Sequence, residues 1–317
     1  MIQRRAVPYS PLVSVLLPAY NHERFVERFL DSVLEDPYPS KELVIIDDGS
    51  MDGTRERIAA WIVRHGADLP VEFVCRANKG IAATLNELAA RARGQYLRLG
   101  ASDDYLLPGG IGAQVAYLQS RPRKWAVVGD SIVVDAQGRQ LHDSGMQDLH
   151  GADKRMYASD EGIRRAVISR WAIGGPVALI RRKGLESVAG WSETLRIDDW
   201  DFFLRLAAHD ALGFIDRPVC AYRLHGENFS RTRNRRVRVH NLMESRDVAL
   251  RRACMFSGPF LLLMRAQAHV IGAKIHFLEH RYGAVAGHML AYAMFSAMAW
   301  VRMRSAQRAL PRRVEHA

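Results

Sequence analysis

Short aliphatic runs alternate with helix-length amphipathic segments over the first hundred residues of this 317-residue chain. The aliphatic runs predict strands at residues 13–17, 42–48, 71–76 and 95–100. The segments between them predict helices at 22–36, 54–66 and 81–94, the last ended by Gly94. This β-α-β-α-β-α-β order predicts an α/β fold, with a Rossmann-like, mostly parallel sheet flanked by helices.

Polar, turn-forming clusters follow each of the four predicted strands. They are Pro18 to Asn21, Asp47 to Ser50, Asn78 to Gly80, and Ser102 to Asp104. Such residues are common in turns for backbone reasons alone. Parallel sheets, however, bind ligands beyond the carboxyl ends of their strands. Four clusters at one edge of the sheet therefore favour a binding site there.

The rest of the chain has a different pattern. A hairpin is predicted around 125–139, a strand at 175–182 and an amphipathic helix at 199–210. An arginine-rich stretch begins at Arg231, followed by two long apolar helical segments near 259–280 and 284–303. We therefore expect a domain over residues 1–230, with halves at about 11–110 and 111–230, and a basic helical region over 231–317.

Charge is distributed unevenly between these two regions. Residues 1–230 hold 29 Lys and Arg against 30 Asp and Glu, whereas residues 231–317 hold 16 against 4. The basic region suits phosphate-bearing partners, either an anionic membrane or nucleic acid. The three cysteines form no CxxC pair and the N-terminal apolar run is too short for a signal peptide, so we expect a cytoplasmic protein.

Two acidic groups and one histidine could carry chemistry. Asp103 and Asp104 at a strand end suit a hard divalent cation shared with a substrate diphosphate, although an acidic turn would look the same. Asp199, beside Asp198, could be a general base or simply stabilise a helix N-terminus. His225 could ligate a metal or contact a diphosphate, or be structural.

Four segments together resemble the inverting family-2 glycosyltransferases, which have the GT-A nucleotide-diphospho-sugar transferase fold. They are VSVLLPAYNHERFVERFLDSVLEDPYPSKELVIIDDGSMDGT, NKGIAATLNELAARARGQYLRLGASDDYLLPG, GWSETLRIDDWDFFLRLA and YRLHGENFSR. The resemblance covers about residues 11–232, and it lies in the ordered series rather than in any single motif.

The resemblance implies a role for each matching residue. The nucleotide would be contacted by Pro18, Tyr20, Asn21, Asp48, Asn78 and Gly80. Asp103 would hold the ribose and a Mg²⁺ or Mn²⁺ ion, with Asp104 and His225 as further metal ligands, and Asp199 would be the catalytic base. Ala101 stands where the family often has the first Asp of its DxD motif, which leaves open whether Asp103 or Asp104 is the main ligand.

The implied activity is inverting transfer of a hexosyl group from a nucleotide-sugar, taken to be UDP-linked, to a glycan or lipid-linked acceptor. Bacterial surface polysaccharide synthesis at the inner face of the membrane is the expected setting. One alternative is a GT-A module that binds nucleotide-sugar without turnover, which Ala101 makes conceivable. Another is nucleic-acid binding through the basic region, but its arginines lack interleaved aromatic residues and we expect no nucleic-acid partner.

Residues 282–301 form an uncharged stretch long enough to span a bilayer. The stretch is rich in alanine and contains His288, so it is only weakly hydrophobic. A helix that packs on the protein or lies on anionic lipid is therefore the preferred interpretation over a membrane span.

Overall fold

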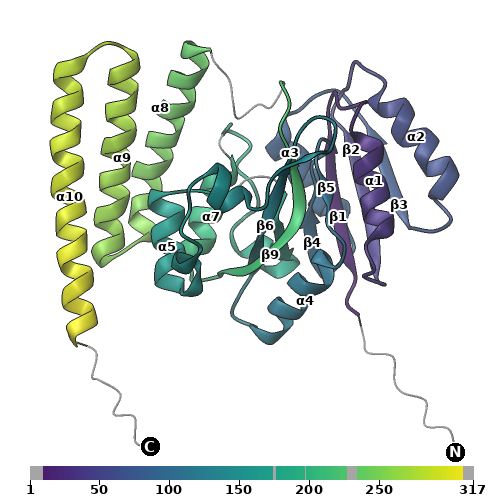
Figure 1. The fold of residues 1–317 in the computed structure, drawn as a ribbon, viewed down its shortest axis with the longest axis horizontal. Coiled ribbons are helices and arrows are strands. Elements are labelled where there is room, and N and C mark those ends of the chain that lie inside the picture. Colours follow the sequence, from purple (N-terminus) through teal and green to yellow (C-terminus); the bar gives the residue numbers. More distant parts are fainter. Residues whose placement is uncertain (1–9, 174–175, 197, 227–233, 310–317) are drawn as a thin grey trace, which may run out of the picture. The chain divides into compact units, whose positions relative to one another are not determined.

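The computed structural model describes residues 10–173, 176–196, 198–226 and 234–309. The arginine-rich stretch that begins at Arg231 lies partly outside the described residues, since Arg231 and Arg233 are not among them. The chain forms two compact units that interleave in sequence (Figure 1). The first comprises Met1–Lys154, Ala172–Glu193 and Ala211–Gly226, and the second Arg155–Trp171, Thr194–Asp210 and Glu227–Ala317.

The first unit is built on one nine-stranded sheet, in the order β3-β2-β1-β4-β8-β6-β9-β5 with β7 paired to β6. Its strands are β1 Val13–Ala19, β2 Lys41–Asp47, β3 Val71–Cys75, β4 Tyr96–Leu99, β5 Tyr105–Leu106, β6 Ala126–Val134, β7 Gln140–His142, β8 Ala178–Arg181 and β9 Leu212–Arg223. Its α-helices are α1 Val26–Glu35, α2 Thr54–His65, α3 Ile81–Arg91, α4 Gly110–Ser120 and α6 Arg182–Ser187.

The first four strands pair in parallel, as the sequence predicts. Beyond β4 the sheet is mixed, because β8 runs antiparallel to both β4 and β6. β6 and β9 are parallel to each other, and the two antiparallel steps through β8 give them the same direction as β4. The carboxyl ends of β1, β2, β4 and β9 therefore lie at one edge of the sheet.

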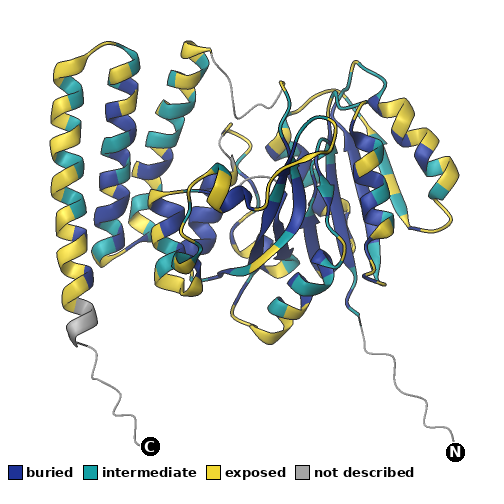
Figure 2. Cartoon of the chain, viewed as in Figure 1, coloured by how far each residue is buried: buried dark blue, intermediate teal, exposed yellow. Residues whose placement is uncertain are grey.

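Residues on both faces of β1 and β2 are buried, whereas β3 at the end of the sheet is only partly covered (Figure 2). Val15 and Leu17 of β1 share a core with Phe29 of α1 and Trp61 of α2, and all four are almost fully buried. Leu16, whose side chain points to the opposite face, is equally buried, and α3 packs against β1 and β2. Burial on both faces explains why these strands are continuous apolar runs instead of alternating ones.

The second unit is helical in its described part. It contains α5 Asp160–Ser169, α7 Asp198–Ala208, α8 Arg235–Arg252, α9 Gly258–Leu278 and α10 Tyr282–Ala309. α9 packs against α5, α8 and α10. The two long apolar helices are confirmed, whereas helix α8 was not predicted within the arginine-rich region.

Candidate active site

Three side chains with metal-ligating atoms meet at the strand ends of the first unit. They are His22, Asp103 and His225, and one ligand atom from each lies within 4.8 Å of the others. His22 follows β1, Asp103 follows β4 and His225 follows β9. Residues far apart in sequence are thus brought together because these strands point the same way.

The cluster is held by specific contacts. Nε2 of His225 lies 3.1 Å from Oδ2 of Asp103, and Nε2 of His22 lies 3.9 Å from the same oxygen. The other ring nitrogen of His22, Nδ1, is 2.8 Å from Oγ of Ser102. Since one nitrogen of His22 is occupied by the serine, the other is directed at the carboxylate. The ring of His225 packs on Phe25 with centroids 5.0 Å apart.

Electrostatics favour the ionised form of Asp103. Burial alone would raise the pKa of this carboxyl, but the hydrogen bond with His225 and the nearby His22 outweigh that effect and hold the pKa below its usual range. An anionic carboxylate beside two imidazoles is a donor set for a divalent cation. Two nitrogen ligands suit Mn²⁺ or a related transition metal better than Mg²⁺, which prefers oxygen.

Asp104 is in a different environment from Asp103. It is buried, and one oxygen accepts the backbone N–H of Arg223 at 2.7 Å. Burial and the neighbouring Asp103 raise its pKa well above the usual range, against the opposing effect of Arg223. Asp104 is not a member of the three-residue cluster, so the geometry favours Asp103 as the main ligand. The predicted role of Asp104 in metal binding stays a prediction.

The predicted nucleotide loops are joined around Asp48. Its carboxylate accepts the backbone N–H groups of Lys79 at 2.9 Å and Gly80 at 3.0 Å, and it pairs with the guanidinium of Arg76. Gly80 has φ +89°, a conformation that side chains disfavour, and a Cβ there would meet no atom within 4 Å. The space above Gly80 is therefore open for a ligand.

The loop that contains Asn78 and the loop that contains Asn21 both contact the loop after β2. The backbone N–H of Asn78 would be only 2.8 Å from a Cβ at Gly49, so the two loops approach closely. Oδ1 of Asn21 accepts the backbone N–H of Met51 at 2.8 Å, which ties the loop after β1 to the loop after β2.

Two further predicted nucleotide contacts, Pro18 and Tyr20, precede Asn21 at the carboxyl end of β1 and in the loop that follows it. Pro18 lies within β1, and the Tyr20 side chain is 44% exposed. Exposure leaves an aromatic ring at the sheet edge that could pack on a ligand.

Asp199 belongs to the second unit, at the start of α7. One of its oxygens accepts the backbone N–H of Trp200 at 2.6 Å. The residue as a whole is exposed, but its carboxyl group loses hydration, and this raises the pKa of the carboxyl. Hydrogen bonds from the Trp200 backbone and the Trp171 side chain oppose the increase. A raised pKa brings a carboxylate closer to the range useful for a general base. Nothing in this geometry tests the predicted catalytic role, and the neighbouring Asp198 side chain lies outside the described residues.

Two site residues were missed by the sequence reasoning. His22 fell inside a predicted helix and Arg76 inside a predicted strand, but the helix begins only at Val26 and the strand ends at Cys75. Each is therefore a strand-end residue. A stricter placement of the element ends would have moved both into the clusters already singled out.

Comparisons with known proteins agree with this architecture. A family model described as glycosyl transferase family 2 matches residues 14–188. The chain is 36% identical over 125 residues to a Bacillus subtilis protein named glycosyltransferase EpsE, covering 39% of this chain and 44% of that protein. It is 26% identical over 231 residues to chondroitin synthase of Escherichia coli, covering 72% of this chain and 31% of the synthase. The chain thus spans less than half the length of these relatives.

Solved structures show the fold. A mannosyltransferase, PcManGT from Pyrobaculum calidifontis in complex with GDP-Man and Mn²⁺, aligns with a TM-score of 0.63 at 20% identity, over 95% of this chain and 87% of that one. Staphylococcus aureus TarS in complex with UDP-GlcNAc aligns with a TM-score of 0.57 at 17% identity, over 95% and 93%. The family model matches more than half of the chain, and the chain therefore belongs to glycosyl transferase family 2, with the GT-A fold.

Proposed function

We propose that this protein transfers a hexosyl group from a UDP-sugar to an acceptor hydroxyl, with inversion at the anomeric carbon. The observation that carries the proposal is the cluster of His22, Asp103 and His225 beside the loops joined at Asp48. A cation-binding group next to an open, glycine-lined loop edge is what a nucleotide diphosphate requires.

The donor is inferred from the Asp48 region. Asp48 is the residue that the family resemblance assigns to the base, and its carboxylate is held by Arg76 and by the backbone of Lys79 and Gly80, next to the open space at Gly80. TarS was solved with UDP-GlcNAc, whereas PcManGT was solved with GDP-Man and Mn²⁺. A GDP-sugar is therefore the competing donor, and a comparison of UDP binding with GDP binding distinguishes the two donors.

The proposed chemistry assigns separate tasks to the residues. His22, Asp103 and His225 would hold the divalent cation, which offsets the charge that develops on the leaving diphosphate. Asp199 would take the proton from the acceptor hydroxyl as that oxygen attacks the anomeric carbon. The new C–O bond forms opposite the bond to the diphosphate, which breaks with its electron pair, so the configuration inverts.

The broader setting follows from the relatives and the charge distribution. We place the catalytic residues in the region 1–230, whose two halves would bind nucleotide and acceptor, and assign residues 231–317 a supporting role. The acceptor is a glycan or lipid-linked glycan, in keeping with relatives named as chondroitin synthase and as a teichuronic acid biosynthesis glycosyltransferase. The reaction would take place in the cytoplasm, at the inner face of a bacterial membrane.

Donor hydrolysis and transfer by the wild type and by Asp199→Asn test the proposal. We expect the variant to lose turnover while it still binds UDP, because Asp199 is assigned to proton transfer and not to the nucleotide. Asp160→Asn, which changes another aspartate in the first turn of a helix, is the matched control and should remain active. Equal, metal-independent background in the wild type and Asp199→Asn would instead support a nucleotide-sugar-binding module without turnover.

A further inference from the structure

Helix α10 exposes an apolar stripe along most of its length. The stripe comprises Leu290, Met294 and Val301, whose exposed fractions are 73%, 51% and 55%. Their spacing of four and seven residues places them on one side of the helix. The stretch Tyr282–Ser305 has a mean hydropathy of 1.4, and only 6% of its apolar window is buried. Such low burial distinguishes α10 from a core helix of a soluble domain.

The opposite side of α10 is held by the protein. Ala299 and Met303 are buried on it, and α10 packs along α9. The ring of His288 lies over Gly272 of α9, where any Cβ would come within 2.7 Å of the imidazole. One side of α10 thus packs on α9, while the other side presents an apolar surface. A helix that lies flat at a membrane–water interface exposes an apolar side in the same way.

Positively charged residues flank this apolar stripe at its two ends. Arg281 precedes α10, and Arg302 and Arg304 follow the stripe, with the Arg304 guanidinium 3.9 Å from the centroid of the Trp300 ring. The sequence of α10 contains no Asp or Glu, and Glu279 is the only acidic residue in the sequence from 258 to 309. Tryptophan beside arginine at the end of an apolar helix is typical of the boundary between lipid tails and headgroups.

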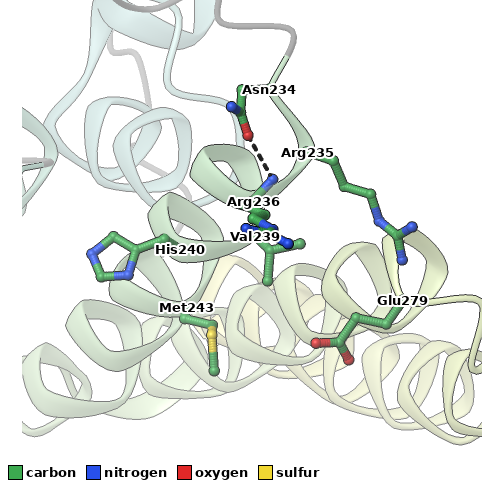
Figure 3. Close-up of a pocket in the computed structure, with 7 residues that line it drawn as sticks. All are labelled: Asn234, Arg235, Arg236, Val239, His240, Met243 and Glu279. Atoms are coloured by element: carbon green, nitrogen blue, oxygen red, sulfur yellow. Dashed lines mark hydrogen bonds between the residues drawn. The ribbon is translucent and has the colours of Figure 1, made fainter.

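A basic pocket adds to the charge of the same unit. It has a volume of about 750 Å³ and lies at the start of α8, where Asn234 caps the helix (Figure 3). Arg235, Arg236 and His240 line it, and among the described residues that line it Glu279 is the only acidic one. That glutamate lies within 4.0 Å of His276 and Arg281, so part of its charge is offset locally.

We propose that the outer face of α10 docks in the plane of an anionic lipid bilayer, with Leu290, Met294 and Val301 among the acyl chains and the arginines at the headgroups. Apolar burial and attraction to anionic lipid act together in such binding. An in-plane helix is preferred to a spanning one because spanning would separate His288 and Met303 from α9. The inference deepens the membrane setting proposed above, but binding needs neither donor nor metal, so its failure would leave the transferase proposal standing.

Sedimentation with preformed vesicles tests the docking. The full chain should bind vesicles of phosphatidylcholine containing phosphatidylglycerol, bind pure phosphatidylcholine vesicles much more weakly, and be released in part by high salt. Leu290→Gln with Met294→Gln should weaken binding about tenfold or more, because two exposed apolar side chains no longer enter the lipid. The matched control changes two exposed apolar residues of the first unit, Val63→Gln and Leu141→Gln, and should bind as the wild type does.

A second pair of variants tests the charge. Arg302→Gln with Arg304→Gln should weaken binding to the anionic vesicles more than the control pair Arg251→Gln with Lys274→Gln, which removes the same charge from exposed positions on α8 and α9. Vesicle binding that is equal in the stripe variant and its control would overturn the proposal. Three other results would also overturn it. The protein could form a dimer without lipid that Leu290→Gln with Met294→Gln converts to a monomer, or it could bind an RNA oligonucleotide more tightly than vesicles. It could also require detergent for extraction from membranes, as a membrane-spanning protein does.

Discussion

The most informative perturbation of the site is His22→Ala, because His22 is the ligand that the sequence reasoning missed. The substitution removes one of three ligating groups, while the backbone N–H of residue 22 keeps its 2.8 Å bond to Oγ1 of Thr54. The loop should therefore stay in place. Substitution of a residue that hydrogen-bonds to a metal ligand lowers metal affinity about 10- to 100-fold. For a direct ligand we expect the upper end of that range, about 100-fold or ~2.7 kcal/mol.

The assay is titration with Mn²⁺, with free ion measured by its electron paramagnetic resonance signal. Ser102→Ala is the graded comparison, since it removes only the 2.8 Å contact that orients His22, and should lower the affinity about tenfold. His142→Ala, a change at an exposed histidine of β7, is the control and should have no effect. Mn²⁺ affinity unchanged in His22→Ala but lost in Asp103→Asn would refute the three-ligand assignment.

Three other expectations concern pH and stability. If Asp199 is the base, its raised pKa predicts that kcat falls, as pH decreases, at a higher pH than an ordinary aspartate would give, and a pH–rate profile measures this. Burial lowers the pKa of His269 and His288, whose Nδ1 atoms are 3.0 Å apart, below the usual 6.5. The unfolded chain then binds more protons, so the melting temperature should drop as pH falls through about 6.5, and less so in His288→Gln. Asp201→Ala should lower the free energy of unfolding by roughly 3 kcal/mol in urea titrations, because the buried carboxylate that pairs with Arg252 is lost.

The parallel half of the sheet could be predicted because its signals are local. Continuous apolar runs such as Val13 to Leu17 are buried on both faces, and the helices between them have a clear apolar side. The position of Asp103 at a strand end then follows from chain order alone. What brings it to His225 is the direction of β9, which depends on a mixed pairing through β8 that no local pattern reveals.

Element ends were the weaker part of the prediction. The helix expected to end at Gly94 ends at Arg91. Gly94 is required for another reason, since a Cβ there would lie 2.7 Å from the backbone nitrogen of Ser14. A tertiary approach of this kind leaves the same glycine in the sequence as a helix terminus does.

Helix α8 escaped prediction because it has almost no apolar side. Of its residues, only Val248 and Ala249 are buried, so the arginine-rich sequence gives no helical periodicity. Its packing against α9 is what makes it part of a folded unit.

The most direct test of the central claim is a thermal-shift measurement of the wild type with UDP, in Mn²⁺ and in EDTA. A ligand that binds only the folded state raises the melting temperature. We expect UDP to stabilise the protein in Mn²⁺, to do so far less in EDTA, and to lose its metal-dependent effect in Asp103→Asn. An equal shift with and without metal, or no shift with any nucleotide, would contradict this claim.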